Sequence, residues 1–151
     1  MAEEWELPGG GGIDVDTAGL EVLDRQECLK LLAAAPLGRV VFTDQALPAV
    51  QPVNFALVGR DIIVRTSPDT KLARATLNAV VAFEVDEYDA YRRTGWSVMV
   101  VGTGRAVTDA AEFAELARLP LRPWAPGERT HFIRIQTRVI TGRRILSQEA
   151  E

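Results

Sequence analysis

The residues whose types and spacing could do chemistry lie between positions 62 and 76, where the chain reads IIVRTSPDTKLARAT. The pattern predicts a strand that ends at Arg65 and Thr66, followed by a helix that has Ser67 as its N-cap. Lys71 follows one turn later. Unpaired N–H groups and the partial positive charge of a helix N-terminus attract anions, and hydroxyl and cationic side chains would add to them here. The combination predicts a phosphate-binding site.

The same segment also fits a capped surface helix in which Arg65 and Lys71 are solvated cations. Asp69 lies two residues before Lys71. Its carboxylate could weaken anion binding, or it could occupy the first helical turn, where acidic residues are favoured. The segment by itself leaves the two interpretations open.

Short runs rich in β-branched residues, separated by turn residues, follow from residue 38 onward and predict six strands. The short connections at 44–48 and 59–61 predict hairpins, so the first three strands should form an antiparallel meander. A helix should precede Pro36, where apolar residues share one helical face, and two shorter helices are expected at 68–77 and 109–119. The predicted strands cover residues 39–43, 49–58, 61–66, 79–86, 96–107 and 130–140.

Six strands and a few short helices favour a mainly β, antiparallel barrel that is closed or nearly closed, because closure removes free strand edges. The predicted strand 96–107 is apolar on both faces, since Trp96, Val98 and Val100 alternate with Met99 and Val101. One face should meet the barrel core and the other a second subunit. The sequence therefore predicts a homodimer.

Composition limits the remaining possibilities. The 151 residues suit one domain, which we place at 18–147 behind a flexible glycine-rich tail at 1–17. The formal net charge of −4 argues against nucleic acid as a partner. One cysteine, no export signal and no long apolar run favour a cytoplasmic protein without membrane spans. One histidine, His131, cannot supply a three-histidine zinc site, and we assign no metal ligands.

Four segments together resemble the pyridoxamine 5′-phosphate oxidase-like family, the FMN-binding split barrels. They are PVNF at 52–55, VRTSPDTKL at 64–72, GWSVMVVGTGRAV at 95–107 and FIRIQTRVITGRRI at 132–145. Their order and spacing fit the family over residues 38–143. The resemblance implies a six-stranded antiparallel split barrel that binds its flavin between two subunits.

The resemblance also assigns roles to particular residues. It implies that the FMN phosphate is held by Arg65, Thr66, Ser67 and Lys71. It implies that the isoalloxazine ring is bordered by Pro52, Val53 and Asn54, and is approached by Trp96 and Ser97 from the strand that lines the dimer cleft. Trp96 could equally be a core aromatic, and Asn54 could simply cap a bulge.

The implied activity is that of an FMN-dependent oxidoreductase with a small-molecule substrate. A flavin carries the redox chemistry itself, so the sequence assigns no catalytic side chain. Two alternatives stay open: a reductase that uses the deazaflavin F420, whose phosphate would need the same residues, and a non-enzymatic flavin- or haem-binding module. The basic and histidine residues expected of a true pyridoxamine phosphate oxidase are not matched, since His131 opens the last predicted strand.

Overall fold

The computed structural model describes residues 13–146 of the chain. Its helices are α1 (Arg25–Ala34), α2 (Lys71–Thr76) and α3 (Ala110–Ala117). Its strands are β1 (Glu21–Val22), β2 (Leu37–Asp44), β3 (Leu47–Val58), β4 (Asp61–Thr66), β5 (Val80–Asp89), β6 (Thr94–Ala106) and β7 (His131–Ile145).

The strands form one antiparallel sheet that closes into a barrel. Their order is β1-β7-β4-β3-β2-β5-β6, and β6 pairs again with β7. The mainly β, antiparallel split-barrel prediction is therefore confirmed. The sheet has a seventh strand beyond the six predicted, because β1 has only two residues and so shows no periodicity in the sequence.

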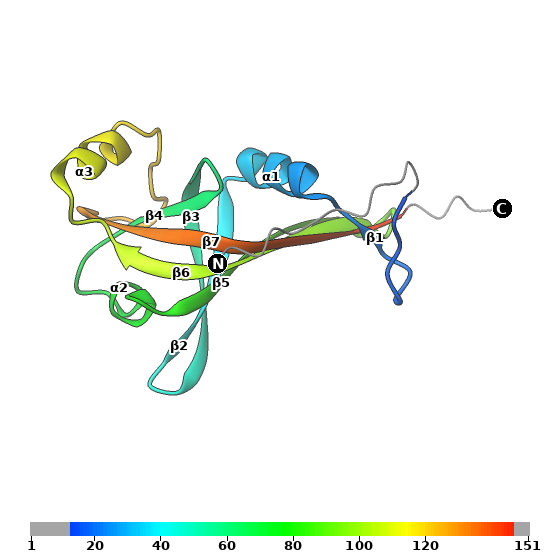
Figure 1. Cartoon of the computed structure of the whole chain (residues 1–151), viewed down its shortest axis with the longest axis horizontal. Coiled ribbons are helices and arrows are strands. Elements are labelled where there is room, and N and C mark those ends of the chain that lie inside the picture. The colour runs from blue at the N-terminus through cyan, green and yellow to red at the C-terminus, as the bar shows by residue number, and fades with distance from the viewer. Residues whose placement is uncertain (1–12, 147–151) are drawn as a thin grey trace.

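Strands β6 and β7 run along the length of the molecule and carry the sheet beyond the barrel on the side of β1 (Figure 1). Their pairing extends from Ala106 opposite Ile133 to Gly95 opposite Ile145. The sequence-based prediction ended the last strand at residue 140, five positions before its end at Ile145. The missed part contains Gly142, where an added Cβ would lie 2.6 Å from Cys28 Sγ. Glycine is a turn signal in sequence patterns, but here it makes room for α1.

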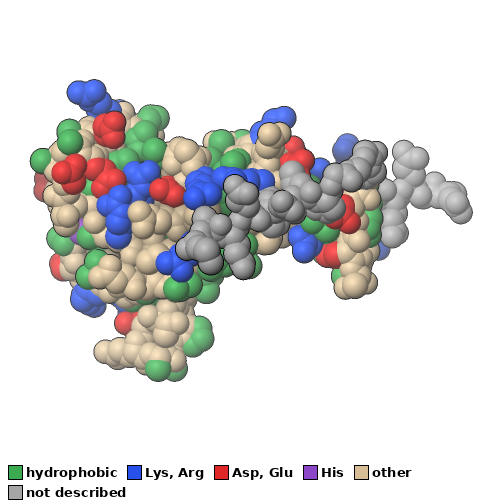
Figure 2. All heavy atoms as spheres, in the orientation of Figure 1, with side chains coloured by type: hydrophobic (Ala, Val, Ile, Leu, Met, Phe, Trp, Pro, Cys, Tyr) green, Lys and Arg blue, Asp and Glu red, His purple; other side chains and the backbone are tan. Residues whose placement is uncertain are grey.

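The two predicted hairpins are confirmed. Only Gln45 and Ala46 separate β2 from β3, and both have positive φ (48° and 66°), the backbone pattern of a type I′ turn. The connection from β3 to β4 contains Gly59 with φ of 61°. The β2–β3 hairpin projects from the barrel, and hydrophobic side chains lie near its tip (Figures 1 and 2).

The barrel core forms around Phe83 of β5, whose ring meets Phe55 of β3 edge-on at 4.7 Å between centroids. Gly38 of β2 lies directly against Phe83, since a Cβ there would come within 2.2 Å of the ring. Helix α1 begins at Asp24, whose carboxylate accepts the N–H of Glu27, and it covers the core with Cys28 and Leu32. This is the helix that the sequence predicted ahead of Pro36.

A smaller apolar cluster joins α3 to the far end of the barrel through Leu116 and Phe132. Beside it, Arg105 and Arg134 share the carboxylate of Glu112, and Arg134 also donates to Asp61 at 2.8 Å. Acidic and basic side chains lie next to one another over this part of the molecule (Figure 2). The network fixes α3 against β4, β6 and β7.

The predicted tail at 1–17 falls partly outside the described residues, which begin at 13. Within the described part, Val15 bridges to Glu21, and the carboxylate of Asp16 accepts Arg143 Nε at 3.0 Å. The boundary at residue 18 stays a prediction. None of the helices between residues 13 and 146 combines the length and apolar character needed to cross a membrane.

Candidate functional site

The segment that suggested a phosphate site folds differently at one point. Ser67 is not the N-cap of α2; Thr70 is, and its Oγ1 accepts the N–H of Ala73 at 3.1 Å. Ser67 instead opens a turn in which the N–H of Thr70 donates to its carbonyl at 3.3 Å. Pro68 suits the second position of such a turn as well as a first helical turn, and this ambiguity explains the wrong prediction.

Arg65 and Thr66 end β4 as expected, and both residues line the cavity described below. Thr66 is 2% exposed, and its hydroxyl shares a hydrogen bond of 3.2 Å with that of Thr70. The Arg65 guanidinium extends across the ring of Phe132 at 5.5 Å and donates through Nε to the carbonyl of Arg129 at 2.6 Å. This end of the strand therefore carries a cationic side chain next to a residue with a buried hydroxyl.

A cavity of about 130 Å³ brings together residues from five parts of the chain. Strand β3 contributes the predicted Pro52, Val53 and Asn54, and β4 contributes Arg65 and Thr66. The other walls come from β2, α2 and the loop at 118–130. We name this the Arg65 cavity; its remaining lining residues are Leu37, Gln51, Leu72, Pro123, Trp124, Ala125 and Arg129.

Ser67 and Lys71 lie beside the Arg65 cavity and do not line it. Ser67 donates to the carbonyl of Glu128 at 3.0 Å. The Lys71 ammonium lies 3.6 Å from the carboxylate of Asp44 and is 59% exposed. An exposed ion pair of this kind contributes little to stability. The Lys71 ammonium could therefore give up Asp44 at little cost and bind a phosphate instead.

The loop at 118–130 is the part of the site that sequence reasoning missed. Asn54 ties it to β3, since its Nδ2 donates to Pro36 and its Oδ1 accepts the main-chain N–H of Trp124 at 2.8 Å. Turn residues in Pro-Trp-Ala-Pro-Gly give this loop no periodicity. One feature of the sequence could have indicated a binding role for this loop: Trp124 and two arginines, Arg122 and Arg129, lie among turn residues just before a strand.

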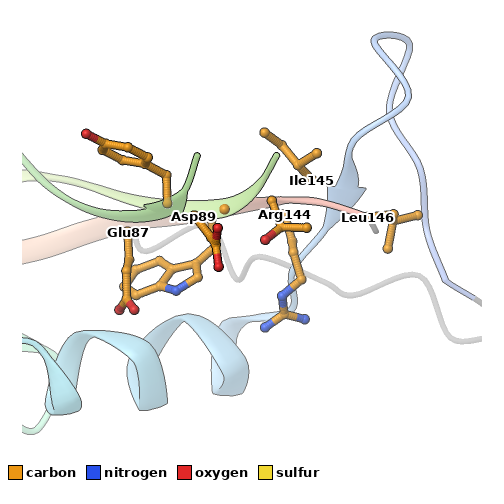
Figure 3. Close-up of a pocket in the computed structure, with 9 residues that line it drawn as sticks. Glu87, Asp89, Arg144, Ile145 and Leu146 are labelled. Carbon is orange, nitrogen blue, oxygen red and sulfur yellow. The ribbon is translucent and has the colours of Figure 1, made fainter. Parts of the chain in front are cut away.

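Trp96 and Ser97 are not brought to the Arg65 cavity within one chain. In the register of the sheet, Trp96 of β6 lies between Glu87 of β5 and Arg144 of β7. Its side chain packs partly against the barrel core and lines an open hollow of about 640 Å³. Figure 3 shows Glu87 and Arg144 of this hollow on the side of the strands that faces α1. Ser97 is exposed on the opposite face, because side chains alternate along a strand.

The outward face of the barrel carries a continuous apolar row. The register places Val41 of β2 beside Ala82 of β5, Ala82 beside Val101 of β6, and Val101 beside Val139 of β7. Val50 of β3 extends the row on the other side of Val41. Val41, Val50 and Val139 are 36%, 60% and 47% exposed. We name these five residues the apolar row.

Glu84 lies next to the apolar row on the same face of β5. Burial raises the pKa of its carboxyl to about 7, and the hydrogen bond and charge of Asp86 act in the same direction. Its Oε1 is buried and has no hydrogen-bond partner in the described part of the chain. Arg39 opposes the rise, but its Nη1 is closer to Asp86 (3.2 Å) than to Glu84 (3.8 Å).

Two other side chains, those of Cys28 and His131, are of types that often take part in chemistry, but both lie away from the Arg65 cavity. Cys28 lies on the buried face of α1 and is fully buried. Burial raises the pKa of its thiol to about 11, so the thiol is poorly suited to nucleophilic chemistry. His131 opens β7 opposite Thr66 and does not line the Arg65 cavity.

The closed antiparallel barrel and a cavity built where β3 and β4 meet define a split-barrel protein. A family model for pyridoxamine 5′-phosphate oxidase matches residues 24–144, and the chain belongs to this family. The family resemblance seen in the sequence is thereby confirmed.

Similar proteins include several from Mycobacterium and Corynebacterium species. The uncharacterised Mycobacterium tuberculosis protein Rv0080 is 42% identical over 130 residues, which are 83% of this chain and 85% of that protein. The structure of the FAD binding protein from Mycobacterium smegmatis is 40% identical, with a TM-score of 0.72 over 82% of this chain and 96% of that one. A Corynebacterium glutamicum structure, provisionally named as a pyridoxamine 5′-phosphate oxidase, is 33% identical, with a TM-score of 0.76 over 94% of this chain and all (100%) of the other.

Proposed function

We propose that this protein is a flavin-dependent oxidoreductase that holds the phosphate end of its cofactor in the Arg65 cavity. The observation that carries the proposal is that Arg65 and Thr66 line the same cavity as Pro52, Val53 and Asn54. The family resemblance assigned the first two to the phosphate and the other three to the border of the flavin ring. Strand register brings these two sets together from β3 and β4.

The residues present suit a phosphate. The residues that line the cavity include two arginines and a threonine, and none of them is an aspartate or a glutamate. Arginine matches phosphate oxygens as a fork of donors, and such charge-assisted hydrogen bonds are the stronger ones. At about 130 Å³ the cavity is far smaller than the 300 to 1,000 Å³ usual for drug-sized ligands. The ring of a flavin would therefore lie at its mouth.

A second copy of the chain would cover that ring. The apolar row offers a surface for an isologous contact, in which the same patch occurs on both subunits. Such a dimer would bring a second set of strands to the mouth of the Arg65 cavity. It would also bring the partner's Ser97 toward the cofactor, because Ser97 and Val101 lie on the same face of β6, whereas Trp96 lies on the other face.

The cofactor would supply the electron or hydride transfer, and the chain would bind, orient and shield it. FMN is the cofactor that the sequence predicts. The relative from Mycobacterium smegmatis is named for FAD, which contains the whole of FMN, and this supports a flavin over the deazaflavin F420. The proposal thus covers a flavin nucleotide whose ribityl phosphate meets Arg65.

The absorption spectrum and mass of the cofactor released from purified protein would identify it. Titrating FMN and riboflavin into apoprotein then tests the phosphate site, because riboflavin has the same ring and lacks the phosphate. Losing one charge-assisted hydrogen bond removes about 1.5 to 3 kcal/mol, so Arg65→Ala should weaken FMN about tenfold to a hundredfold and change riboflavin little. Arg74→Ala, on the exposed surface of α2, is the matched control. Equal losses for both ligands would refute the assignment.

Light scattering with Val101→Asp tests the dimer. A charge in the middle of the apolar row should give a monomer and weaken the flavin, while Tyr91→Asp, on the exposed turn between β5 and β6, should leave both unchanged. A wild-type protein that is monomeric with its cofactor bound would contradict the second-copy proposal.

A further inference from the structure

The loop at 118–130 is fastened to the Arg65 cavity at three points by residues that the sequence assigned to the cofactor. Asn54 accepts the main-chain N–H of Trp124, Arg65 donates to the carbonyl of Arg129, and Ser67 donates to the carbonyl of Glu128. All three fastenings use main-chain atoms of the loop. The side chains of Trp124 and Arg129 are therefore available for another purpose.

Arg129 is placed as an anion-binding side chain. It lines the Arg65 cavity, and its Nε is buried without a hydrogen-bond partner in the described residues. Its Nη2 has one long contact, 3.5 Å to the carbonyl of Pro126. A buried charged donor without an acceptor is unfavourable, and an anionic ligand would supply that acceptor.

Two arginines, Arg65 and Arg129, line the same small cavity from different elements. In the proposed function, Arg65 and Thr66 would bind the first phosphate at the end of β4. Arg129 enters from the loop and so approaches from another side. A diphosphate, with a second charged group attached to the first, would satisfy both guanidinium groups.

Trp124 adds an aromatic plane at the same place. Its main chain is held by Asn54, yet its side chain is 70% exposed, although it lines the cavity. Large aromatic side chains are usually buried, and an exposed one that is fixed beside an anion site is suited to stack on a nucleobase.

We infer that Arg129 and Trp124 form a subsite for the second phosphate and the adenine base of a dinucleotide flavin, so that the protein selects FAD over FMN. The inference rests on the proposed flavin function. It assigns to the loop a role in specificity that is separate from the Arg65 contact with the first phosphate.

The test compares FAD and FMN affinity for apoprotein by calorimetry. Arg129→Gln removes the guanidinium and keeps the carbonyl that Arg65 uses, and Trp124→Leu keeps the N–H that Asn54 uses. Each substitution should weaken FAD about tenfold or more and FMN less than about twofold, given the usual strength of charge-assisted bonds and base stacking. Arg122→Gln, on the same loop and outside the cavity, should change neither. Unchanged thermal unfolding would show that the variants are folded.

Equal effects on FAD and FMN, or no effect on either, would overturn the inference. ADP carries the diphosphate and adenine without the flavin, so it should bind to wild type and bind about tenfold more weakly to Arg129→Gln. If neither flavin binds, the proposed function fails, and ADP alone then decides on the subsite: Arg129-dependent binding supports it and absent binding refutes it.

Discussion

Replacing Glu84 with glutamine should make the stability of this protein less dependent on pH. The native pKa of about 7 lies above the ordinary value of 4.5, so the folded state holds a proton that the unfolded state has already lost. The resulting stabilisation is complete below about pH 4.5 and disappears as the pH rises through 7. Wild type should therefore be less stable at pH 8 than at pH 5.

The structure sets the size of this effect. A rise in pKa from 4.5 to about 7 corresponds to at most about 3 kcal/mol. The Glu84 side chain keeps 29% of its surface exposed, and solvent screening lowers that limit. We expect Glu84 to account for about 1 to 2 kcal/mol of the difference between pH 5 and pH 8. A second subunit on the apolar row would bury Glu84 further and act in the same direction.

Urea unfolding at pH 5 and pH 8 measures the effect as a difference between proteins. Glu84→Gln should lose about 1 to 2 kcal/mol less than wild type between the two pH values, because the amide cannot ionise. Glu87→Gln, an exposed position on the same strand, serves as the control and should behave as wild type does. If Glu84→Gln and wild type lose the same free energy, burial of Glu84 does not govern its ionisation.

Three further predictions concern the scaffold. Gly104→Ala should lower the free energy of unfolding by about 1 to 3 kcal/mol in urea, because its Cβ would lie 2.2 Å from the carbonyl oxygen of Thr76; an unchanged midpoint would show that the backbone yields. Arg134→Met should cost about 3 kcal/mol, since it leaves the mostly buried carboxylate of Asp61 without its cationic partner and removes one of the two arginines that bind Glu112, whereas Arg92→Met, in an exposed pair, should change stability by less than about 0.5 kcal/mol. Cys28 should resist iodoacetamide at pH 8 until the protein unfolds, because its thiol is buried and its pKa is raised to about 11; rapid labelling of native protein would contradict this.

Most of the barrel could be predicted from the sequence because its strands are encoded locally. Runs of β-branched residues gave the six long strands, and the short connections gave the hairpins. The part of β7 after residue 140 was missed because Gly142 and the arginines beside it do not resemble a strand. Gly142 stands there because a Cβ at this position would clash with the side chain of Cys28, and no local sequence pattern reveals that contact.

The site was partly predictable for a similar reason. Arg65, Thr66 and the Pro52–Asn54 segment were found from motifs, and the cavity that joins them depends on the pairing of β3 with β4. Trp96 and Ser97 lie on opposite faces of β6, which strand alternation alone would have indicated. The loop with Trp124 and Arg129 was not predictable, because its position depends on hydrogen bonds from Asn54, Arg65 and Ser67 to its main chain.

The pairing of β7 also bears on how the protein is made. This strand is the last element in the chain order, and it pairs with β1, β4 and β6. During synthesis the barrel therefore stays open until residue 145 has left the ribosome. Until then, the edges of β4 and β6 that pair with β7 have no partner strand. Unpaired strand edges are prone to aggregation, so the nascent chain is most vulnerable just before synthesis of β7 is complete.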